Sequence, residues 1–375
     1  MNAKKSDLAL CLLFALGLST MALLFWLLPA RSYSPLEKRY LAPAPALNAQ
    51  ELLSGRFADS AERYYADHLP GRDFWVGLNA YFDLLTGRQR GKDVLLGRSG
   101  SLYERPKTWD EAAARGNMDA INAFAAALDC PVTLMLVPSA GYVLAEDLPP
   151  LCERYTDGEM IEMICAMAEE PLCCCDLLSV FAQAPDRFAL FYGTDHHWTS
   201  RGAYTACRTY LESRGRVCPD ESDYTIRSAS GSFRGSTYAR SALWLQKAER
   251  VELWDSGGRF TVRFSEKEGS HEGLFFTERL DEDDQYTVFL DGNHSLVFID
   301  NAAPAAEGTL LVVRDSFANC LGCFLADNYR RVILVDLRYY KNEVSALCAA
   351  ENVDEVLAVY SLGNFLTDSN LVWLR

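Results

Sequence analysis

The stretch Gly308-Thr309-Leu310-Leu311-Val312-Val313-Arg314-Asp315-Ser316-Phe317 decides the fold of this 375-residue chain. Residues 309–313 form a short apolar run, which is typical of a strand buried on both faces of a parallel sheet. Runs of the same character recur at 132–137 (VTLMLV), 188–192 (FALFY), 331–335 (RVILV) and 355–359 (EVLAV). Segments with helical spacing separate these runs. The pattern therefore predicts an α/β fold in which helices cover both faces of a parallel sheet.

The remaining elements follow from the same periodicities. We expect helices at 57–69, 76–85, 118–128, 160–167, 198–213 and 317–325, and a hairpin formed by 94–97 and 101–103. Between about 220 and 300 the alternation stops, and polar turns separate predicted strands at 224–233, 250–254, 259–264, 286–290 and 295–299. The sequence therefore predicts a β-rich insert at about 220–300, ahead of Ser316.

The N-terminus carries an uncharged apolar run from Leu8 to Leu28, preceded by Lys4 and Lys5. A helix of this length crosses a hydrocarbon core of roughly 30 Å, and the lysines favour a cytoplasmic N-terminus. This predicts a single-pass anchor in the cell membrane, with the rest of the chain on the extracytoplasmic side. A cleaved signal peptide is the alternative, although residues 28–31 (LPAR) offer a poor cleavage site.

Three parts are expected along the chain: the anchor at 1–30, a proline-interrupted juxtamembrane stalk at 31–60, and one domain at 61–375 that includes the insert. The formal net charge of the chain is −15. Since Lys4, Lys5 and Asp7 contribute +1, the rest of the chain carries −16. This acidic balance argues against nucleic acid or anionic lipid head groups as partners.

Twelve cysteines are many for an exported chain. Cys11 lies in the apolar run, and the eleven others cannot all pair internally because their number is odd. Cys320 and Cys323 have CxxC spacing, but no matching second pair supports a zinc site. We expect most cysteines to be small buried apolar residues, and no metal or cofactor is predicted.

Two short segments carry the chemistry. Asp195-His196-His197-Trp198 follows the expected strand 188–192, and Ser316 follows the expected strand 309–313. Reactive groups in open parallel sheets lie at the carboxyl ends of strands, so these groups meet if the strands are neighbours. They would then form a nucleophilic serine, an imidazole that takes its proton and a carboxylate that orients the imidazole.

Structural roles for the same residues remain open. Ser316 could cap a helix, and Asp195 could be a helix N-cap. Trp198 could stack on a sugar or pack as a buried aromatic ring. Arg338 could hold an anionic group or form an ordinary ion pair.

The segment Thr194-Asp195-His196-His197-Trp198-Thr199 resembles the signature of the DHHW proteins, which are similar to the SGNH-hydrolase-like proteins of alginate O-acetylation. Further blocks resemble that family along almost the whole chain, at residues 36–42, 65–73, 315–317 and 336–340. The resemblance implies an SGNH-like three-layer fold with a triad of Ser316 as nucleophile, His197 as base and Asp195 as orienting acid. The order Asp, His, Ser is permuted relative to ordinary SGNH enzymes, and the alginate-acetylation proteins share the permuted order.

The resemblance also implies details of the site. Gly363-Asn364 resembles the block that provides an oxyanion donor, which makes Asn364 a candidate donor. His197, and not His196, matches the position of the family's base. Arg314 departs from the Gly-Asp-Ser of SGNH enzymes, so the sequence does not assign the remaining donors of the oxyanion hole.

The implied function is membrane-anchored, extracytoplasmic O-acetyl transfer to a cell-surface or exported polysaccharide through an acyl-serine. The implied partners are the polysaccharide acceptor and a multi-pass membrane O-acyltransferase that supplies acetyl groups. Two alternatives stay open. One is a polysaccharide acetyl esterase with the same triad, and the other is a non-catalytic surface or assembly protein on a degenerate SGNH scaffold.

Overall fold

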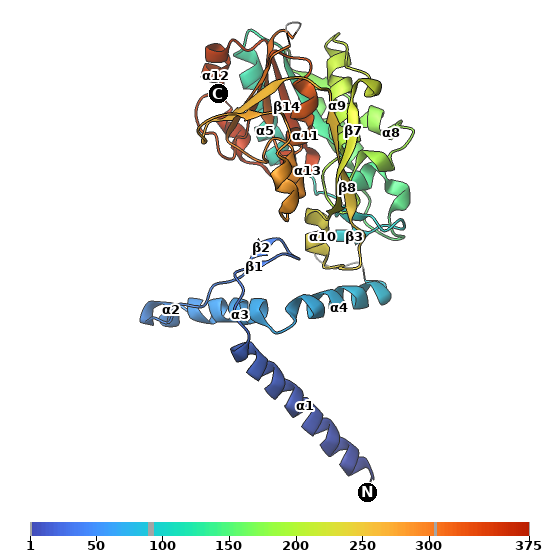
Figure 1. Cartoon of the computed structure of the whole chain (residues 1–375), viewed down its shortest axis with the longest axis vertical. Coiled ribbons are helices and arrows are strands. Elements are labelled where there is room, and N and C mark those ends of the chain that lie inside the picture. Colours follow the sequence, from blue (N-terminus) through green and yellow to red (C-terminus); the bar gives the residue numbers. More distant parts are fainter. Residues whose placement is uncertain (1, 89–93, 304–305, 375) are drawn as a thin grey trace. The chain divides into compact units, whose positions relative to one another are not determined.

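The computed structural model describes residues 2–88, 94–303 and 306–374, which divide into two compact units (Figure 1). The first unit holds Met1–Gly91 and Ala239–Leu245. The second unit holds Lys92–Tyr238 and Gln246–Arg375.

The first unit contains the N-terminal apolar helix α1 (Asn2–Leu27). Its segment Ser6–Leu27 has a mean hydropathy of 2.4, none of it is buried, and it is long enough to cross a membrane. The other elements of this unit are β1 (Tyr33–Ser34), β2 (Arg39–Tyr40), α2 (Ala49–Leu53), α3 (Arg56–His68) and α4 (Arg72–Leu85). The helices predicted at 57–69 and 76–85 are α3 and α4.

An eight-stranded sheet organises the second unit, in the order β10-β9-β11-β13-β12-β14-β5-β6. Its five parallel strands are β5 (Val132–Val137), β6 (Cys173–Cys175), β12 (Thr309–Arg314), β13 (Arg331–Val335) and β14 (Glu355–Ser361). Strands β9 (Phe260–Phe264), β10 (His271–Glu272) and β11 (Leu296–Asn301) extend it in antiparallel fashion. The predicted parallel sheet is thus confirmed, with β12 between two parallel neighbours.

Helices cover both faces of this sheet, as predicted. One face packs against α8 (Leu177–Ala182), α9 (Ser200–Ser213) and α11 (Ala318–Leu325). The other packs against α5 (Glu111–Ala126), α7 (Asp157–Cys165), α12 (Val344–Glu351) and α13 (Leu362–Thr367). Side chains of β12 alternate between the layers, with Leu310 and Val312 on the first face and Leu311 and Val313 on the second.

Smaller elements complete the second unit. They are β3 (Val94–Leu96) and β4 (Leu102–Glu104), which form the predicted hairpin, the pair β7 (Thr225–Phe233) and β8 (Glu249–Asp255), and the short helix α6 (Ala140–Val143). Helix α10 (Ser236–Ser241) begins in this unit. Short 3-10 helices lie at Ala145–Asp147, Phe188–Leu190, Glu221–Asp223, Thr277–Asp281, Gln285–Val288 and Asn370–Trp373.

The strand predicted at 188–192 is wrong. Phe188–Leu190 is a 3-10 helix, and the backbone around it bonds to the residues that follow rather than to the sheet. The Thr199 N–H donates to the Leu190 carbonyl at 2.9 Å, and the Tyr192 N–H donates to the His197 carbonyl at 3.2 Å. The segment around Asp195 and His197 is therefore a loop folded back on itself, and it does not follow a strand of the sheet.

The β-rich region at about 220–300 differs from the prediction in two ways. Its strands β9, β10 and β11 join the central sheet, and only β7 and β8 pair separately. The strand predicted at 286–290 is wrong, because Gln285–Val288 is a 3-10 helix and Leu290 and Asp291 have positive φ angles of 54° and 60°.

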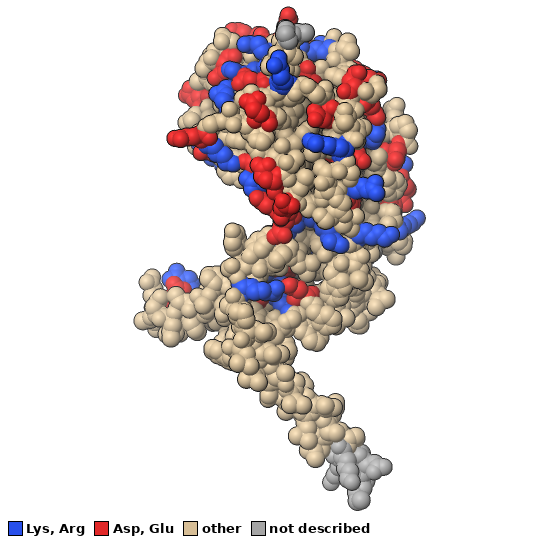
Figure 2. Space-filling model, viewed as in Figure 1, with Lys and Arg blue, Asp and Glu red and all other residues tan. Residues whose placement is uncertain are grey.

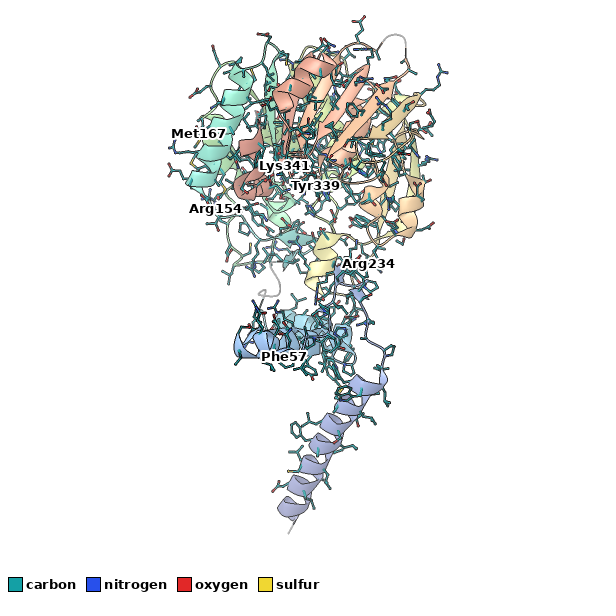
Figure 3. The ribbon with its side chains drawn as sticks, turned by 90° about the vertical axis from the view of Figure 1, so that its left-hand side faces the viewer. Phe57, Arg154, Met167, Arg234, Tyr339 and Lys341 are labelled. Atoms are coloured by element: carbon teal, nitrogen blue, oxygen red, sulfur yellow. The ribbon has the colours of Figure 1, made fainter. Side chains whose placement is uncertain are left out.

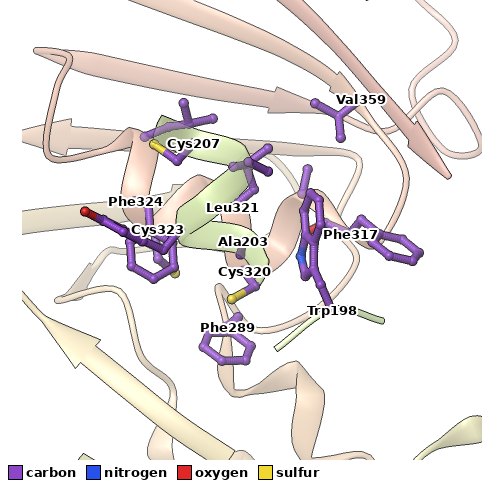
Figure 4. Close-up of a cluster of buried hydrophobic side chains, with 14 of the residues drawn as sticks. Trp198, Ala203, Cys207, Phe289, Phe317, Cys320, Leu321, Cys323, Phe324 and Val359 are labelled. Atoms are coloured by element: carbon purple, nitrogen blue, oxygen red, sulfur yellow. The ribbon is translucent and has the colours of Figure 1, made fainter. Parts of the chain in front are cut away.

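The cysteines on α11 have the apolar role that we expected. Cys320 and Cys323 are buried beside Phe324 and Leu321, and Cys207 of α9 lies in the same cluster (Figure 4). Burial raises the pKa of Cys320 and that of Cys323 above the ordinary thiol value. These thiols therefore stay protonated and pack as small apolar groups.

Candidate active site

Ser316 lies in the turn between β12 and α11, at the carboxyl end of a central strand. The carboxylate of its buried neighbour Asp315 organises this turn. It accepts hydrogen bonds from the backbone N–H groups of Phe317 at 3.0 Å and Ser361 at 2.8 Å, and from Asn364 Nδ2 at 2.8 Å. Asp315 thus joins the turn after β12 to the turn after β14 and holds Ser316 at the edge of the sheet where ligands bind in open α/β folds.

The structure brings Ser316, His197 and Asp195 together. His197 Nε2 lies 2.7 Å from Ser316 Oγ, and His197 Nδ1 lies 2.5 Å from Asp195 Oδ1. Because the carboxylate can only accept, Nδ1–H donates to Asp195, which leaves Nε2 to accept the serine hydroxyl. Asp195 and His197 are buried, whereas Ser316 is half-buried. In this arrangement the imidazole can take the serine proton while the carboxylate stabilises the imidazolium.

Backbone donors hold Asp195 in its charged form. The His197 N–H donates to Oδ1 at 2.9 Å, and the Ser236 N–H donates to Oδ2 at 2.6 Å. Burial raises the pKa of Asp195, but the neighbouring charges of His197 and His196 and these hydrogen bonds outweigh it. The pKa of Asp195 therefore lies well below its usual range. The Ser236 N–H can approach because its predecessor is Gly235, where a Cβ would lie 2.1 Å from Asp195 Oδ2.

Glu249, the first residue of β8, supports the same loop from outside the triad. Its carboxylate accepts from the backbone N–H groups of Gly193 at 2.7 Å and Thr194 at 2.6 Å, and from the Thr194 hydroxyl. Burial raises the pKa of Glu249, partly offset by these donors. Glu249 therefore fixes the two residues that precede Asp195. Nothing in its sequence context indicates this role.

Tyr286 is a second site residue that the sequence did not reveal. Its ring stacks on the His197 imidazole, with centroids 4.0 Å apart and planes inclined by 10°. Phe317 flanks the same imidazole at 4.9 Å. Burial raises the pKa of Tyr286 well above the ordinary phenol value, so its hydroxyl stays protonated. These two rings restrict the tilt of the imidazole between Asp195 and Ser316.

His196 occupies a different environment from His197. Its Nδ1 lies 2.6 Å from Ser236 Oγ, and its side chain is partly exposed. Asp195, His196 and His197 offer ligand atoms within 4.8 Å of one another, the separation that one metal ion requires. However, Asp195 and His197 already direct these atoms at each other and at Ser316, so their arrangement suits proton transfer better than coordination.

The substrate-binding role predicted for Trp198 does not fit its burial. Its side chain is fully buried, and Nε1 donates to the Phe317 carbonyl at 3.1 Å. The indole packs between α9 and the start of α11 (Figure 4). Trp198 thus positions the loop and the serine turn relative to each other, and no face of its ring is available for a sugar.

Asn364 and Arg338 are both engaged by carboxylates. Asn364 lies beside the serine turn, but its Nδ2 donates to Asp315, which leaves a single N–H for an oxyanion. Arg338 lies in the turn that follows β13, and Figure 3 labels Tyr339 and Lys341 of the same stretch. The Arg338 Nε donates to Asp336 Oδ1 at 2.9 Å and its Nη2 donates to Oδ2 at 2.6 Å, so it forms an ion pair with the residue two positions earlier.

Arg314, which replaces the usual glycine before Asp-Ser, is buried. Its guanidinium donates to Asn293 Oδ1 at 2.8 Å, Asn319 Oδ1 at 2.7 Å and the His294 carbonyl at 3.2 Å. Asp336 lies 4.0 Å from the same group and supplies the countercharge. The arginine is therefore accommodated by packing and polar contacts, and it is not among the residues that line the cleft beside the triad.

A cleft of about 130 Å³ adjoins the triad. Asp195, His196, Phe317, Gly363 and Asn364 are among the residues that line it. The rest of its wall comes from 102–104, Lys107, 137–141 and 361–362. Polar and apolar walls next to a half-buried serine are suited to hold an acyl group or a hydroxyl acceptor.

Together, the three layers of helices, sheet and helices and the Asp-His-Ser site define an SGNH-hydrolase-like α/β fold with a permuted motif order. The comparisons with known proteins agree, and they confirm the resemblance read from the sequence. A family model described as SGNH hydrolase-like domain, acetyltransferase AlgX, matches residues 89–217. The model for DHHW protein matches residues 158–335, which include all three triad residues.

Individual relatives point the same way. A protein described as probable alginate O-acetylase AlgJ of Pseudomonas putida is 25% identical over 173 residues, 44% of this chain and 45% of that protein. The chain therefore spans less than half the length of this curated relative. Two solved structures share the fold. A DHHW family protein of Eubacterium siraeum has a TM-score of 0.66 at 18% identity, over 76% of this chain and 95% of that one. Bacillus cereus PatB1 with a sulfonyl adduct has a TM-score of 0.64 at 21% identity, over 76% and 99%.

Proposed function

We propose that this chain is an O-acetyltransferase that carries acetyl groups on Ser316 and delivers them to hydroxyl groups of a cell-surface or exported polysaccharide. The observation that carries the proposal is the continuous hydrogen-bonded series Ser316–His197–Asp195 beside an open cleft. The similarity to a probable alginate O-acetylase and to the acetyltransferase family model supports acetyl as the group and polysaccharide as the acceptor.

The first half-reaction loads the serine. Ser316 Oγ attacks the carbonyl carbon of an acetyl donor while its proton passes to His197 Nε2. Asp195, ionised because its pKa is lowered, stabilises the imidazolium. Candidate donors for the oxyanion are the backbone N–H of Ser316 and the second N–H of Asn364. The tetrahedral intermediate collapses, the leaving group takes the proton from Nε2, and acetyl-Ser316 remains.

The second half-reaction transfers the acetyl group. A sugar hydroxyl in the cleft gives its proton to His197 Nε2 and attacks the acetyl carbonyl. Collapse then returns the proton to Ser316 Oγ and releases the acetylated sugar. With α1 as an anchor, the site would work on the extracytoplasmic side of the membrane. There a multi-pass membrane O-acyltransferase would act as the supplier of acetyl groups.

An esterase with the same triad is the second candidate, because water can replace the sugar in the second half-reaction. The partial exposure of Ser316 is the observation that favours it. The two functions differ only in the acceptor that reaches acetyl-Ser316, which depends on the access of water to the cleft.

The test uses the full chain in detergent micelles with p-nitrophenyl acetate. We expect a burst of p-nitrophenol, a 42-dalton mass increase on the peptide that contains Ser316, and loss of both in Ser316→Ala. Ser228→Ala, a change of an exposed serine on β7, is the matched control. Equal background rates in the wild type and Ser316→Ala would refute an acyl-serine mechanism and favour the non-catalytic alternative. A polysaccharide acceptor added to the loaded enzyme then separates transfer from hydrolysis, since only transfer yields an acetylated sugar.

A further inference from the structure

Helix α4 has an apolar face that the described chain leaves about half exposed or more. Phe74, Trp75, Leu78, Phe82 and Leu85 are each 46–86% exposed. At 3.6 residues per turn these five side chains lie within a sector of about 100° around the helix axis. Exposed large apolar residues are normally scattered, so a continuous stripe of three aromatic residues and two leucines requires a partner.

A neighbouring face of α4 has its partner within the same unit, and Phe74 also contributes to it by stacking on Trp244, with ring centroids 5.8 Å apart. Gly77 packs against Trp244, where an added Cβ would lie 1.9 Å from the indole. Tyr81 contacts the same indole at 5.3 Å, and its hydroxyl accepts from the Leu245 N–H at 2.8 Å. The exposed stripe therefore adjoins the face that folding buries and shares Phe74 with it, whereas Leu78, Phe82 and Leu85 remain 46–86% exposed.

The start of α4 is tied to the end of the apolar helix α1. Phe25 near the end of α1 packs against Tyr64 and Tyr65 of α3, with ring centroids 6.0 and 5.0 Å apart. Just beyond α1, Arg31 forms an ion pair with Asp73 of α4 at 3.3 Å. If α1 crosses a membrane, its end lies at the bilayer surface, and these contacts place the beginning of α4 at the same level.

The composition of this region suits a bilayer surface. Residues 74–82 (FWVGLNAYF) carry no charge, and Leu52, Leu53, Tyr65 and Leu69 add further exposed apolar side chains on α2, α3 and the turn before α4. Figure 2 shows few charged side chains on the visible face of α2–α4, whereas acidic and basic groups are dense on the second unit. Tryptophan and tyrosine concentrate at membrane–water interfaces, where amphipathic helices lie parallel to the surface.

We propose that α4 lies in the outer surface of the membrane that α1 crosses, with its Phe74–Leu85 stripe among the lipid acyl chains. The occupant of this face is lipid. Since residues 74–82 carry no charge, apolar burial of the stripe drives the contact. This inference goes beyond acyl transfer, because it concerns where the chain is held and not its chemistry.

The experiment places a photoreactive benzoylphenylalanine at single positions of the full chain in vesicles of pure phosphatidylcholine. Leu78 and Phe82 are the test positions, and Asp83, on the opposite side of α4, is the matched control. We expect at least about tenfold more lipid adduct at 78 and 82 than at 83, since an interfacial helix immerses only its apolar face. Phe188, an exposed ring of the second unit, is expected to give no lipid adduct.

A label at Leu18 in α1 separates the possible failures. Lipid adducts at 18 with none at 78 and 82 would overturn the proposal while leaving the anchor intact. Adducts from 78 or 82 to residues 92–375, to a second copy or to another membrane protein would overturn it as well, because a protein surface would then cover the stripe. Absence of lipid adducts at 18 would overturn the anchor and this proposal together. None of these outcomes depends on acetylation of Ser316, which is measured separately.

Discussion

Asp195 is the residue around which the candidate site is organised. Its two carboxylate oxygens accept from an imidazole N–H and two backbone N–H groups, and it faces no solvent. Such a group is expected to act by orienting His197 and stabilising its positive charge, without taking the proton itself.

Asp195→Asn should therefore lower the rate of Ser316 acetylation by roughly 10²–10⁴-fold, because the amide can stabilise neither the imidazolium nor the Nδ1–H tautomer. The rate of p-nitrophenol release measures this. Asp119→Asn, at an exposed position on α5, is the control. A rate for Asp195→Asn within twofold of that control would contradict the role assigned to Asp195.

The raised pKa of Asp327, which follows α11, leads to a prediction about stability. Burial raises the pKa of Asp327 to about 6, although Ser256 and Tyr224 donate to its carboxylate. Between pH 4 and 6 the folded state keeps a proton that the unfolded state has lost. The free energy of unfolding therefore falls as the pH rises through this window.

Asp327→Asn removes this titration. Between pH 4 and pH 7 the free energy of unfolding of the variant should rise by about 2–3 kcal/mol relative to that of the wild type, since one pKa unit corresponds to about 1.4 kcal/mol. Denaturant unfolding at both pH values, with Asp119→Asn alongside, measures the difference. Parallel pH dependence of all three proteins would contradict the raised pKa.

At the scale of elements, the turn between β7 and α10 determines the position of Asp195. The Ser236 N–H reaches the carboxylate only because Gly235 has no side chain. A short connection at the end of one strand pair thus acts on a loop some 40 residues earlier in the chain.

Gly235→Ala should disturb the site without unfolding the sheet. Its Cβ would lie 2.1 Å from Asp195 Oδ2, so either the turn or the carboxylate must move. We expect the rate of p-nitrophenol release to fall by at least about tenfold, as small displacements of catalytic groups are costly. Gly231→Ala, on β7 with no atom within 4 Å of the added Cβ, should match the wild type. Equal rates for the two variants would show that the turn does not position Asp195.

At the scale of the whole molecule, the candidate active site and the proposed membrane contacts belong to different units. Every residue of the triad and the adjoining cleft belongs to the second unit, whereas α1 and the exposed stripe of α4 belong to the first. The chemistry of Ser316 should therefore survive changes that release the chain from the membrane.

Deletion of residues 2–24 tests this separation, since it removes most of α1 but keeps Phe25. The full chain should resist extraction from membranes by alkaline carbonate, whereas the deletion variant should be extracted, as expected for a spanning helix compared with an interfacial one. Release of p-nitrophenol should be unchanged. If expression of the wild-type gene yields a soluble product that lacks the first 30 residues, the result would instead support a cleaved signal peptide.

The resemblance to the DHHW signature pointed to the three candidate triad residues. The sequence by itself determined the alternation of strands and helices, the placement of Ser316 after a buried strand and the apolar N-terminal helix. These features are encoded locally, because periodicity reports which side chains are buried. Only the tertiary structure decided that 188–192 bonds to 197–199 instead of to the sheet, that Trp198 is enclosed, and that Asn364 is bound to Asp315. It also revealed Glu249, Tyr286 and Gly235 as supports of the site and left an apolar stripe of α4 exposed. Each of these outcomes depends on contacts between residues far apart in the chain, which local composition does not specify.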